Sequence, residues 1–170
     1  MEIIEFEDYL SRLPELLKEH NSTVIVKSSN TCILYGEGGF NNPTNLPAYK
    51  THEFGGVIVN FKGDISIGNY VIDNFDFGKN FINKLAEYLK LRDLNCEILN
   101  NDIIVDGQYK VASYMSQRVG EVIYTAIHIS INVDLELIKN ICTKEMLKTP
   151  RGLSDYGITQ DEIINFVKRG

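Results

Sequence analysis

The sequence has no block of basic residues and no long apolar run. Its 170 residues carry a formal net charge of −6, with 17 Lys and Arg against 23 Asp and Glu. Binding to long nucleic acids depends on a basic surface, so this balance argues against a nucleic-acid partner. No apolar run reaches the length of a transmembrane helix, and the acidic N-terminus MEIIEFEDYL lacks the apolar core of a signal peptide. We therefore expect a cytoplasmic protein without a membrane partner.

Cysteine and histidine are also scarce. The sequence contains three cysteines, widely spaced and without a CxxC pair, and three histidines, none at a metal-binding spacing such as HExxH. The odd number of cysteines argues against a disulfide framework, and their spacing argues against a zinc site. Both observations suit a reducing compartment.

What is present is typical of a folded domain. Hydrophobic residues make up 44% and charged residues 24% of the chain, which is ordinary for a globular protein. There is no internal repeat, low-complexity tract or linker, so we predict one domain over residues 1–170. Helical and alternating apolar patterns both occur, which predicts the α+β class, with a mixed or antiparallel sheet and helices packed on one side.

Apolar spacing and turn residues give the approximate positions of the elements. The expected helices are 3–20 (kinked or broken at Pro14), 75–91, 134–139, 144–148 and one that opens with the capping-box sequence TQDE at 159–162. The expected strands outside the central stretch are 23–27, 31–35, 55–62, 64–72 (interrupted by Gly68) and 94–99. Segment 36–50 is rich in Gly, Asn and Pro and is expected to be a loop.

The chain is organised around residues 101–134, which read as three strands in series. Strand 103–105 is followed by the turn dipeptide Asp106-Gly107, strand 109–119 by a second reversal at Gly120, and strand 122–132 alternates well. Its isoleucines point to one face and form a core surface, whereas the polar side chains point to the other face. We expect a small-molecule cavity on the polar face, lined by Lys110, Ser113, Tyr124 and His128.

This stretch resembles the catalytic core of the biotin and lipoate protein ligases, a family that includes the octanoyltransferases. In that family a segment of the form Asn-Asp-Ile/Leu-x-Val-Asp/Asn-Gly-x-x-Lys precedes a strand that ends in Asn-Val-Asp/Asn. Here NDIIVDG at 101–107 leads into KVAS at 110–113, and the later strand ends in NVDL at 132–135. The resemblance implies the class II aminoacyl-tRNA synthetase-like fold of these catalytic domains in reduced form, without the accessory C-terminal domain of many lipoate ligases.

A second family motif is matched only in its centre. The ligases carry Arg-Arg-x-Ser/Thr-Gly-Gly-Gly-Ala-Val-x-His-Asp, whose backbone N–H groups contact the acyl-adenylate. GGVIV at 55–59 matches the Gly-Gly-Ala-Val centre, but Phe54 replaces the first glycine, Asn60 replaces the histidine, and no arginine precedes them. Phe61 stands where the octanoyltransferases have a histidine. The nearest positive charges are those of Lys50 and His52.

The resemblance implies roles for several residues. Lys110 would contact the acyl carbonyl and the phosphate of the adenylate, and Asp102 would hold Mg²⁺ beside a phosphate. Cys142, shortly after the strand end, would be the acyl-accepting nucleophile of an octanoyltransferase, paired with Lys110. The residues expected to line the substrate and nucleotide site are Gly55, Gly56, Val57, Asn101, Asp102, Val111, Ala112, Ser113 and His128.

The activity implied is attachment of a lipoyl, octanoyl or related acyl group to a lysine of a lipoyl-type carrier domain. A ligase would use ATP and Mg²⁺ with lipoate or octanoate, and the segment RGLS at 151–154 looks more like a lipoate ligase than a biotin ligase. One alternative is an octanoyltransferase that uses Cys142 and Lys110 without ATP. Another is a non-catalytic relative that binds a ligand or a protein. Lys110 can also be a solvated strand residue, Cys142 a packing residue, and His128 an ordinary hydrogen-bonded or exposed histidine.

Overall fold

A computed structural model describes residues 2–19, 22–50, 56–72 and 76–170 of the chain. The strands of the larger sheet are β1 (Glu2–Glu5), β2 (Ser22–Lys27), β6 (Ile65–Val71), β7 (Cys96–Leu99), β8 (Asp102–Val105), β9 (Tyr109–Val119), β10 (Val122–Ile129) and β11 (Thr149–Pro150). The smaller sheet consists of β3 (Cys32–Tyr35), β4 (Ala48–Lys50) and β5 (Val57–Asn60). The helices are α1 (Phe6–Leu16), α2 (Phe77–Leu91), α3 (Leu135–Ile141) and α4 (Gln160–Arg169), with a 3-10 turn η1 (Leu153–Tyr156).

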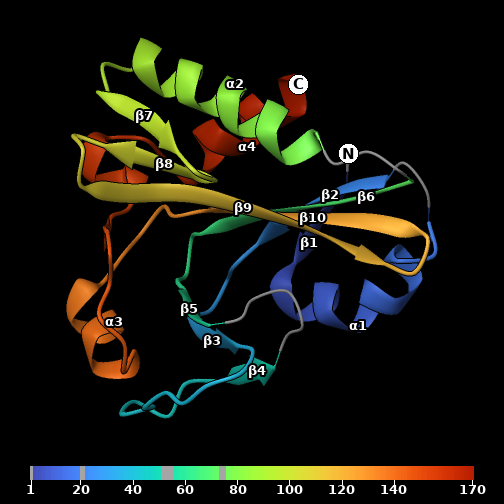
Figure 1. The fold of residues 1–170 in the computed structure, drawn as a ribbon, viewed down its shortest axis with the longest axis horizontal. Coiled ribbons are helices and arrows are strands. Elements are labelled where there is room, and N and C mark those ends of the chain that lie inside the picture. Colours follow the sequence, from blue (N-terminus) through green and yellow to red (C-terminus); the bar gives the residue numbers. More distant parts are fainter. Residues whose placement is uncertain (1, 20–21, 51–55, 73–75) are drawn as a thin grey trace.

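The larger sheet is mixed and runs through the centre of the molecule (Figure 1). Its strand order is β1-β2-β6-β10-β9-β8-β7, and β11 pairs with β9 where β10 has ended. The β1–β2 and β9–β11 pairs are parallel, whereas the other pairs are antiparallel. The α+β class and the mixed sheet agree with the sequence-based prediction.

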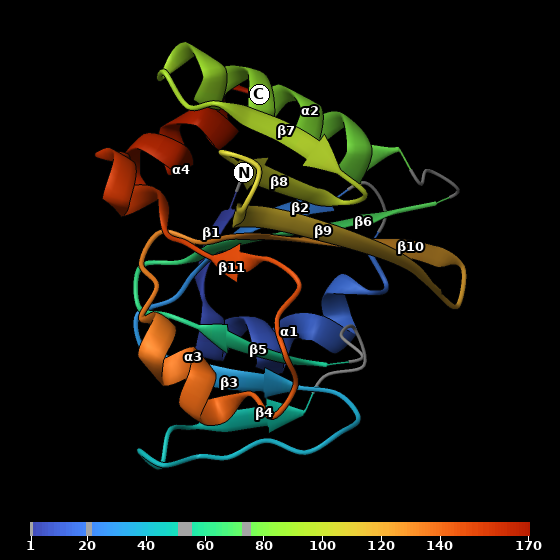
Figure 2. The same ribbon diagram turned by 60° about the vertical axis from the view of Figure 1, so that its left-hand side comes forward.

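The helices cover both faces of this sheet, not one face as the sequence suggested. Helices α2 and α4 pack on one face over the isoleucines of β10, including Ile127 and Ile129. Helix α1 packs on the other face, where Tyr9 contacts a second core with Tyr70 and Tyr124. Figure 2 shows α3 beside β3 and β5 on the same side as α1, around a third apolar cluster. The polar face of β10 is on this second side of the large sheet and is directed toward β5 and α3.

The two predicted reversals of the central stretch are present because the sequence supplies residues that accept left-handed backbone. Asp106 and Gly107 have φ values of 54° and 70°, and Gly120 has a φ of 64°. The predicted N-caps are also present, since Asp134 accepts a hydrogen bond from the Leu137 N–H and Thr159 accepts one from the Glu162 N–H. Helices α3 and α4 therefore begin where the sequence placed them.

Three local predictions are wrong and a fourth holds only in part. Residues Glu2–Glu5 form β1 instead of the first turn of a helix, because they pair in parallel with β2, a contact that local spacing does not reveal. Pro14 lies within a single helix, α1, so the helix is not broken there. Gly68 continues β6, paired with Val24 and Ala126 on either side. Segment 144–148 contains no helix; it is irregular with bends, and Met146, Leu147 and Lys148 line a cavity.

The last features of the fold are the start of the second helix and the lengths of the helices. Phe75, where the second helix is predicted to begin, lies outside the described residues, and α2 starts at Phe77 after its N-cap Asp76. Within the described ranges, none of the helices is both long enough and apolar enough to cross a membrane.

Candidate active site

Three neighbouring strands place a row of polar side chains on one face of the large sheet. Asp102 of β8 is paired with Ser113 of β9, and Ser113 is paired with His128 of β10. Residues directly opposite each other in antiparallel strands point to the same face, so these three side chains form a row. The row lies on the face opposite α2 and lines a cavity of about 370 Å³.

Lys110 reaches the same face through a β-bulge. Residues three apart on a regular strand point to opposite faces, so Lys110 and Ser113 would be separated. The register between β8 and β9 shifts here: Ile103 is opposite Ala112 and Ile104 is opposite Lys110, which leaves Val111 without an opposite residue on β8. A bulge of this kind re-aims the side chains on one side of it. Lys110 consequently lines the cavity with Ser113.

Lys110 and Asp102 form an ion pair in this cavity. Lys110 Nζ lies 3.4 Å from Asp102 Oδ1, and the side chains are 39% and 29% exposed. This exposure leaves both charged groups accessible to a ligand while the pairing limits the freedom of the lysine. The arrangement can present a positive charge to a carboxylate or a phosphate.

Two hollows meet at this ion pair. The first, of about 370 Å³, is mostly apolar and is walled by β5, by the start of α3 and by the 144–148 segment. The second, of about 410 Å³, is more polar and extends past Asn100 and Asn101. The residues shared by both hollows are Ile58, Asp102, Lys110, Ser113 and His128. A ligand with an apolar part and a polar part could therefore occupy both hollows, with its central atoms beside this shared set.

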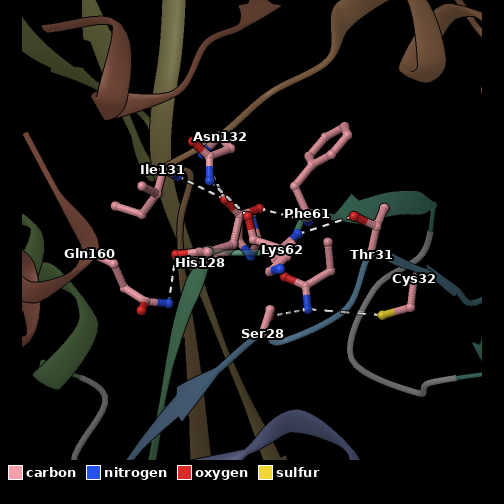
Figure 3. Close-up of polar contacts among 12 residues, drawn as sticks. Ser28, Thr31, Cys32, Phe61, Lys62, His128, Ile131, Asn132 and Gln160 are labelled. Atoms are coloured by element: carbon pink, nitrogen blue, oxygen red, sulfur yellow. Dashed lines mark hydrogen bonds and ion pairs between the residues drawn. The ribbon is translucent and has the colours of Figure 1, made fainter. Parts of the chain in front are cut away.

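His128 is held from behind by a buried carboxylate. Its Nε2 lies 3.3 Å from Asp64 Oδ2, and the His128 side chain is 13% exposed whereas that of Asp64 is fully buried. Asp64 Oδ1 accepts hydrogen bonds from the backbone N–H groups of Ile131 and Asn132, and Oδ2 accepts one from Phe61 (Figure 3). Asp64 therefore joins the β5–β6 turn to the end of β10 and fixes the His128 ring.

This contact is not predictable from the sequence pattern. Asp64 stands between the expected strands 55–62 and 64–72, at a Gly63-Asp64 turn, and nothing in the local pattern connects that turn to His128. A buried aspartate in a Gly-Asp turn before a strand is ordinary turn chemistry. Only the pairing of β6 with β10 brings the two residues together.

Cys142, the predicted acyl-accepting nucleophile, lies just beyond α3 and lines the apolar hollow. Burial raises the pKa of its thiol, and among the described residues no cation is paired with it. A raised pKa keeps a thiol protonated near neutral pH, which is the opposite of an activated nucleophile. The predicted pairing of Cys142 with Lys110 is not present, because Lys110 is engaged with Asp102.

The glycine motif is only partly within the described residues, since Gly55 and His52 lie outside them. Gly56 is exposed on a bend, where its carbonyl accepts a hydrogen bond from Gly36, and a Cβ there would meet nothing within 4 Å. Val57 lines the apolar hollow. Lys50 is exposed at the end of β4 and does not line either hollow.

The residues that replace the family's polar groups in this motif serve packing. Asn60 is fully buried and donates a hydrogen bond to the Ser28 hydroxyl, and Phe61 is 6% exposed and forms part of the apolar wall. The site thus has an apolar surface, from Phe61, where the octanoyltransferase motif has a histidine.

Three other predicted site residues have separate outcomes. Ala112 lines the apolar hollow, and Asn101 lines the polar one. Val111 does not line either, because the bulge directs its fully buried side chain into the core beneath α2. The prediction that Tyr124 lines the cavity is also wrong, because it is 3% exposed and its hydroxyl is hydrogen-bonded to Tyr9 in the α1 core.

Comparisons with solved structures identify the fold. A bi-partite lipoate protein ligase from Thermoplasma acidophilum superposes with a TM-score of 0.74 at 12% identity, over 99% of this chain and 80% of that one. The chain has the fold of a lipoate and biotin ligase catalytic domain. LipL1 of P. falciparum, solved with lipoate, gives a TM-score of 0.72 at 17% identity, covering 99% of this chain and 60% of that one.

The ligase fold is shared with more distant structures. Lipoate-protein ligase A bound with ATP matches 86% of this chain and 69% of that one, with a TM-score of 0.66 and 14% identity. A biotin protein ligase from Leishmania major has a TM-score of 0.51 at 12% identity over 96% of this chain and 69% of that one. No protein-family model matches the sequence, and no curated protein matches it either. At these identities the comparisons establish the fold alone.

Proposed function

We propose that this protein attaches lipoate or a related acyl group to a lysine of a lipoyl-type carrier domain, through an acyl-adenylate. The observation that carries the proposal is the Lys110–Asp102 pair at the junction of an apolar and a polar hollow. It is supported by the KVAS segment at 110–113 and by structural similarity to lipoate ligases.

The two hollows suit the two halves of an acyl-adenylate. The apolar hollow takes the hydrocarbon chain, because its wall consists of aliphatic, aromatic and thioether side chains. Those wall residues are Val57, Ile58, Val59, Phe61, Val133, Ile138, Met146 and Leu147. The polar hollow beside Asn101 takes the nucleotide. The mixed anhydride between acyl group and phosphate then lies at the shared residues.

Lys110 acts at that junction by stabilising negative charge. Its ammonium group compensates the charge of the lipoate carboxylate and then of the phosphate that leaves, which is worth most where water is excluded. ATP enters as a substrate. Asp102 is the carboxylate among the described residues that line both hollows, and its second oxygen is available to hold Mg²⁺, which commonly binds through one or two carboxylates and substrate phosphates. The metal would supply charge neutralisation at the phosphates.

A thioester route through Cys142 is the second candidate, because this residue lines the same apolar hollow. The raised pKa of its thiol and the engagement of Lys110 with Asp102 weigh against it. Activity without ATP, from an octanoyl carrier thioester, would favour this route over adenylation.

The test is intact-mass analysis of an apo lipoyl carrier domain incubated with the protein, ATP, Mg²⁺ and lipoate or octanoate. We expect a mass gain of one acyl group that requires ATP and is lost in Lys110→Ala. No gain with either acid, and none with an octanoyl carrier thioester as donor, would contradict both enzymatic functions. Retained binding of lipoate or carrier in that case would indicate a non-catalytic relative.

A further inference from the structure

We propose that His128 accepts the proton released when the carrier lysine attacks the acyl group, and that Asp64 positions the His128 ring for this step. The inference deepens the proposed function and rests on it. It assigns a task to a histidine that the resemblance placed only among the residues lining the site. It also assigns a task to an aspartate outside the family motifs considered above.

His128 lies where the reacting atoms would be. It is one of the few residues that line both hollows, so it borders the junction between acyl chain and nucleotide. Ser113 is beside it on β9, and Asp102 is next in the row on β8. A group at this junction touches the scissile acyl–phosphate bond whichever hollow the rest of the ligand occupies.

Asp64 fixes the orientation of the ring. Its carboxylate is fully buried and is held by three backbone N–H groups, from Phe61, Ile131 and Asn132. His128 Nε2 lies 3.3 Å from the oxygen that also accepts from Phe61. A carboxylate is an acceptor, so it favours the tautomer with hydrogen on Nε2 and leaves Nδ1 with a lone pair. Figure 3 shows the His128 side chain directed into this group of contacts.

The chemistry of the transfer step requires such an acceptor. The ε-amine nitrogen of the carrier lysine forms a bond to the acyl carbon, and the bond between that carbon and the phosphate oxygen breaks, with its electron pair leaving on AMP. The attacking nitrogen then carries a surplus proton, which passes to His128 Nδ1. An imidazole can take up and release a proton near neutral pH.

The other titratable groups around His128 are less suited to this task. Lys110 is a donor without an acceptor site, and Asp102 is paired with it. Burial raises the pKa of the Cys142 thiol, and Lys148 is occupied with the Gly107 carbonyl. Together with Asp64 and with Tyr114, which lines the polar hollow, these are the titratable side chains of the described residues that face His128 or line the hollows from the surrounding elements.

The test separates the two half-reactions. Adenylate formation is followed as pyrophosphate release from ATP and lipoate, and transfer is followed in a single turnover from preformed lipoyl-adenylate to an apo carrier domain. In His128→Gln we expect transfer at pH 7 to fall by about 100-fold or more relative to adenylate formation. The loss should shrink as the pH rises, because hydroxide then replaces His128 as the acceptor of the surplus proton on the attacking nitrogen. Lys139→Met, on the outer face of α3, is the matched surface control.

The test of Asp64 needs a measurement that would not change if Asp64 contributed only to folding. Asp64→Asn can still accept from Ile131 and Asn132 but presents an amide to the ring or to Phe61, so folding is checked first by circular dichroism. In the wild-type protein, ¹⁵N NMR of the His128 ring should show hydrogen on Nε2. In Asp64→Asn the tautomer population should shift, and the pH profile of transfer should shift with it.

The outcomes distinguish this inference from the proposed function. A wild-type protein that forms no adenylate and transfers no acyl group overturns the function and the inference together. A wild-type protein that transfers, with a His128→Gln variant of equal rate and equal pH profile, overturns the inference alone. An Nδ1–H tautomer in the wild-type protein overturns the role of Asp64 even where His128→Gln is slow.

Discussion

Lys110 Nζ lies 3.4 Å from Asp102 Oδ1, although the two residues are not opposite each other in the strand register. Asp102 is opposite Ser113, and Lys110 is opposite Ile104. The extra residue Val111 turns Lys110 to the face that carries Asp102. The central charge of the site is thus produced by an irregularity in the sheet.

Replacing this lysine should remove the chemistry and leave the fold intact. Lys110→Met keeps most of the apolar stem and removes the charge at the acyl–phosphate junction. We expect acyl attachment to fall by about 10²–10³-fold, the usual cost of losing one group that stabilises developing charge. The rate is measured by mass spectrometry of the carrier domain. An exposed lysine on α3, in Lys139→Met, serves as the control, and a Lys110→Met rate equal to the control would contradict the assigned role.

Cys142 should be dispensable. Because burial raises its pKa, the thiolate fraction near neutral pH is smaller than for an ordinary thiol. Cys142→Ser is therefore expected to retain acyl attachment within a few-fold. Alkylation of Cys142 in the wild-type protein by iodoacetamide should be slower at pH 7 than alkylation of an exposed cysteine in a peptide and should rise with pH, as followed by peptide mass spectrometry. Cys32 should react more slowly still, because burial raises its pKa to about 11. Rapid alkylation of Cys142 at pH 7 would reverse this conclusion.

Gly152 should be required for stability because the chain passes it closely. A Cβ on Gly152 would overlap the carbonyl oxygen of Ile131, two residues beyond the end of β10, the strand that carries His128. Gly152→Ala should lower the free energy of unfolding by about 1–3 kcal/mol, as overpacking usually does. Gly39→Ala is the matched control, because a Cβ there would meet nothing within 4 Å and the φ of Gly39 is not positive. Urea denaturation of both variants measures the difference, and equal midpoints would show that the segment can move away.

The contact between α2 and α4 should make stability depend on pH. Burial on its own would raise the pKa of Glu162, but hydrogen bonds from Tyr88 and Arg92 outweigh it and hold the pKa of this carboxyl below its ordinary range. A carboxyl group with a lowered folded pKa stabilises the protein fully above its unfolded pKa, and that contribution is lost as the pH falls through the folded value.

The variant that tests this contact is Glu162→Gln. We expect its Tm to be roughly 2–4 °C below that of the wild type at pH 7, and the difference to be smaller at pH 3. Glu145→Gln, in an exposed segment, should change little at either pH. A difference that persists unchanged at pH 3 would show that the charge of Glu162 is not the cause.

The sequence predicted the site best where the relevant contacts are local. The hairpin at Asp106 and Gly107 follows from two residues that accept positive φ, and the alternation of β10 correctly separated core residues from His128. The motif at 110–113 correctly placed Lys110 in a cavity, although the implied role of that lysine awaits the experiments above. These features depend on backbone preferences and on side-chain periodicity, both of which can be recognised from a few consecutive residues.

The parts that the sequence did not predict depend on contacts between distant segments. The apolar spacing of residues 2–5 is typical of a helix, but these residues form strand β1 because they pair in parallel with β2. Tyr124 has the period of a cavity residue, but α1 covers its end of the strand. The partner of His128 comes from another strand pair altogether, and a bulge such as that at Val111 leaves no composition signal. Each of these required knowledge of which elements are neighbours.

The extra residue of the β8–β9 bulge, Val111, affects how relatives of this chain should be recognised. If a homologue kept the KVAS segment but lacked one residue of the turn before it, the ladder between β8 and β9 could be regular, and the lysine, then opposite the position of Val105, would point into the apolar core beneath α2. A lysine retained at that aligned position would then no longer line the cavity. The number of residues between the aspartate and the serine is therefore as diagnostic as their identities, and alignments that place a gap there would group proteins with different chemistry.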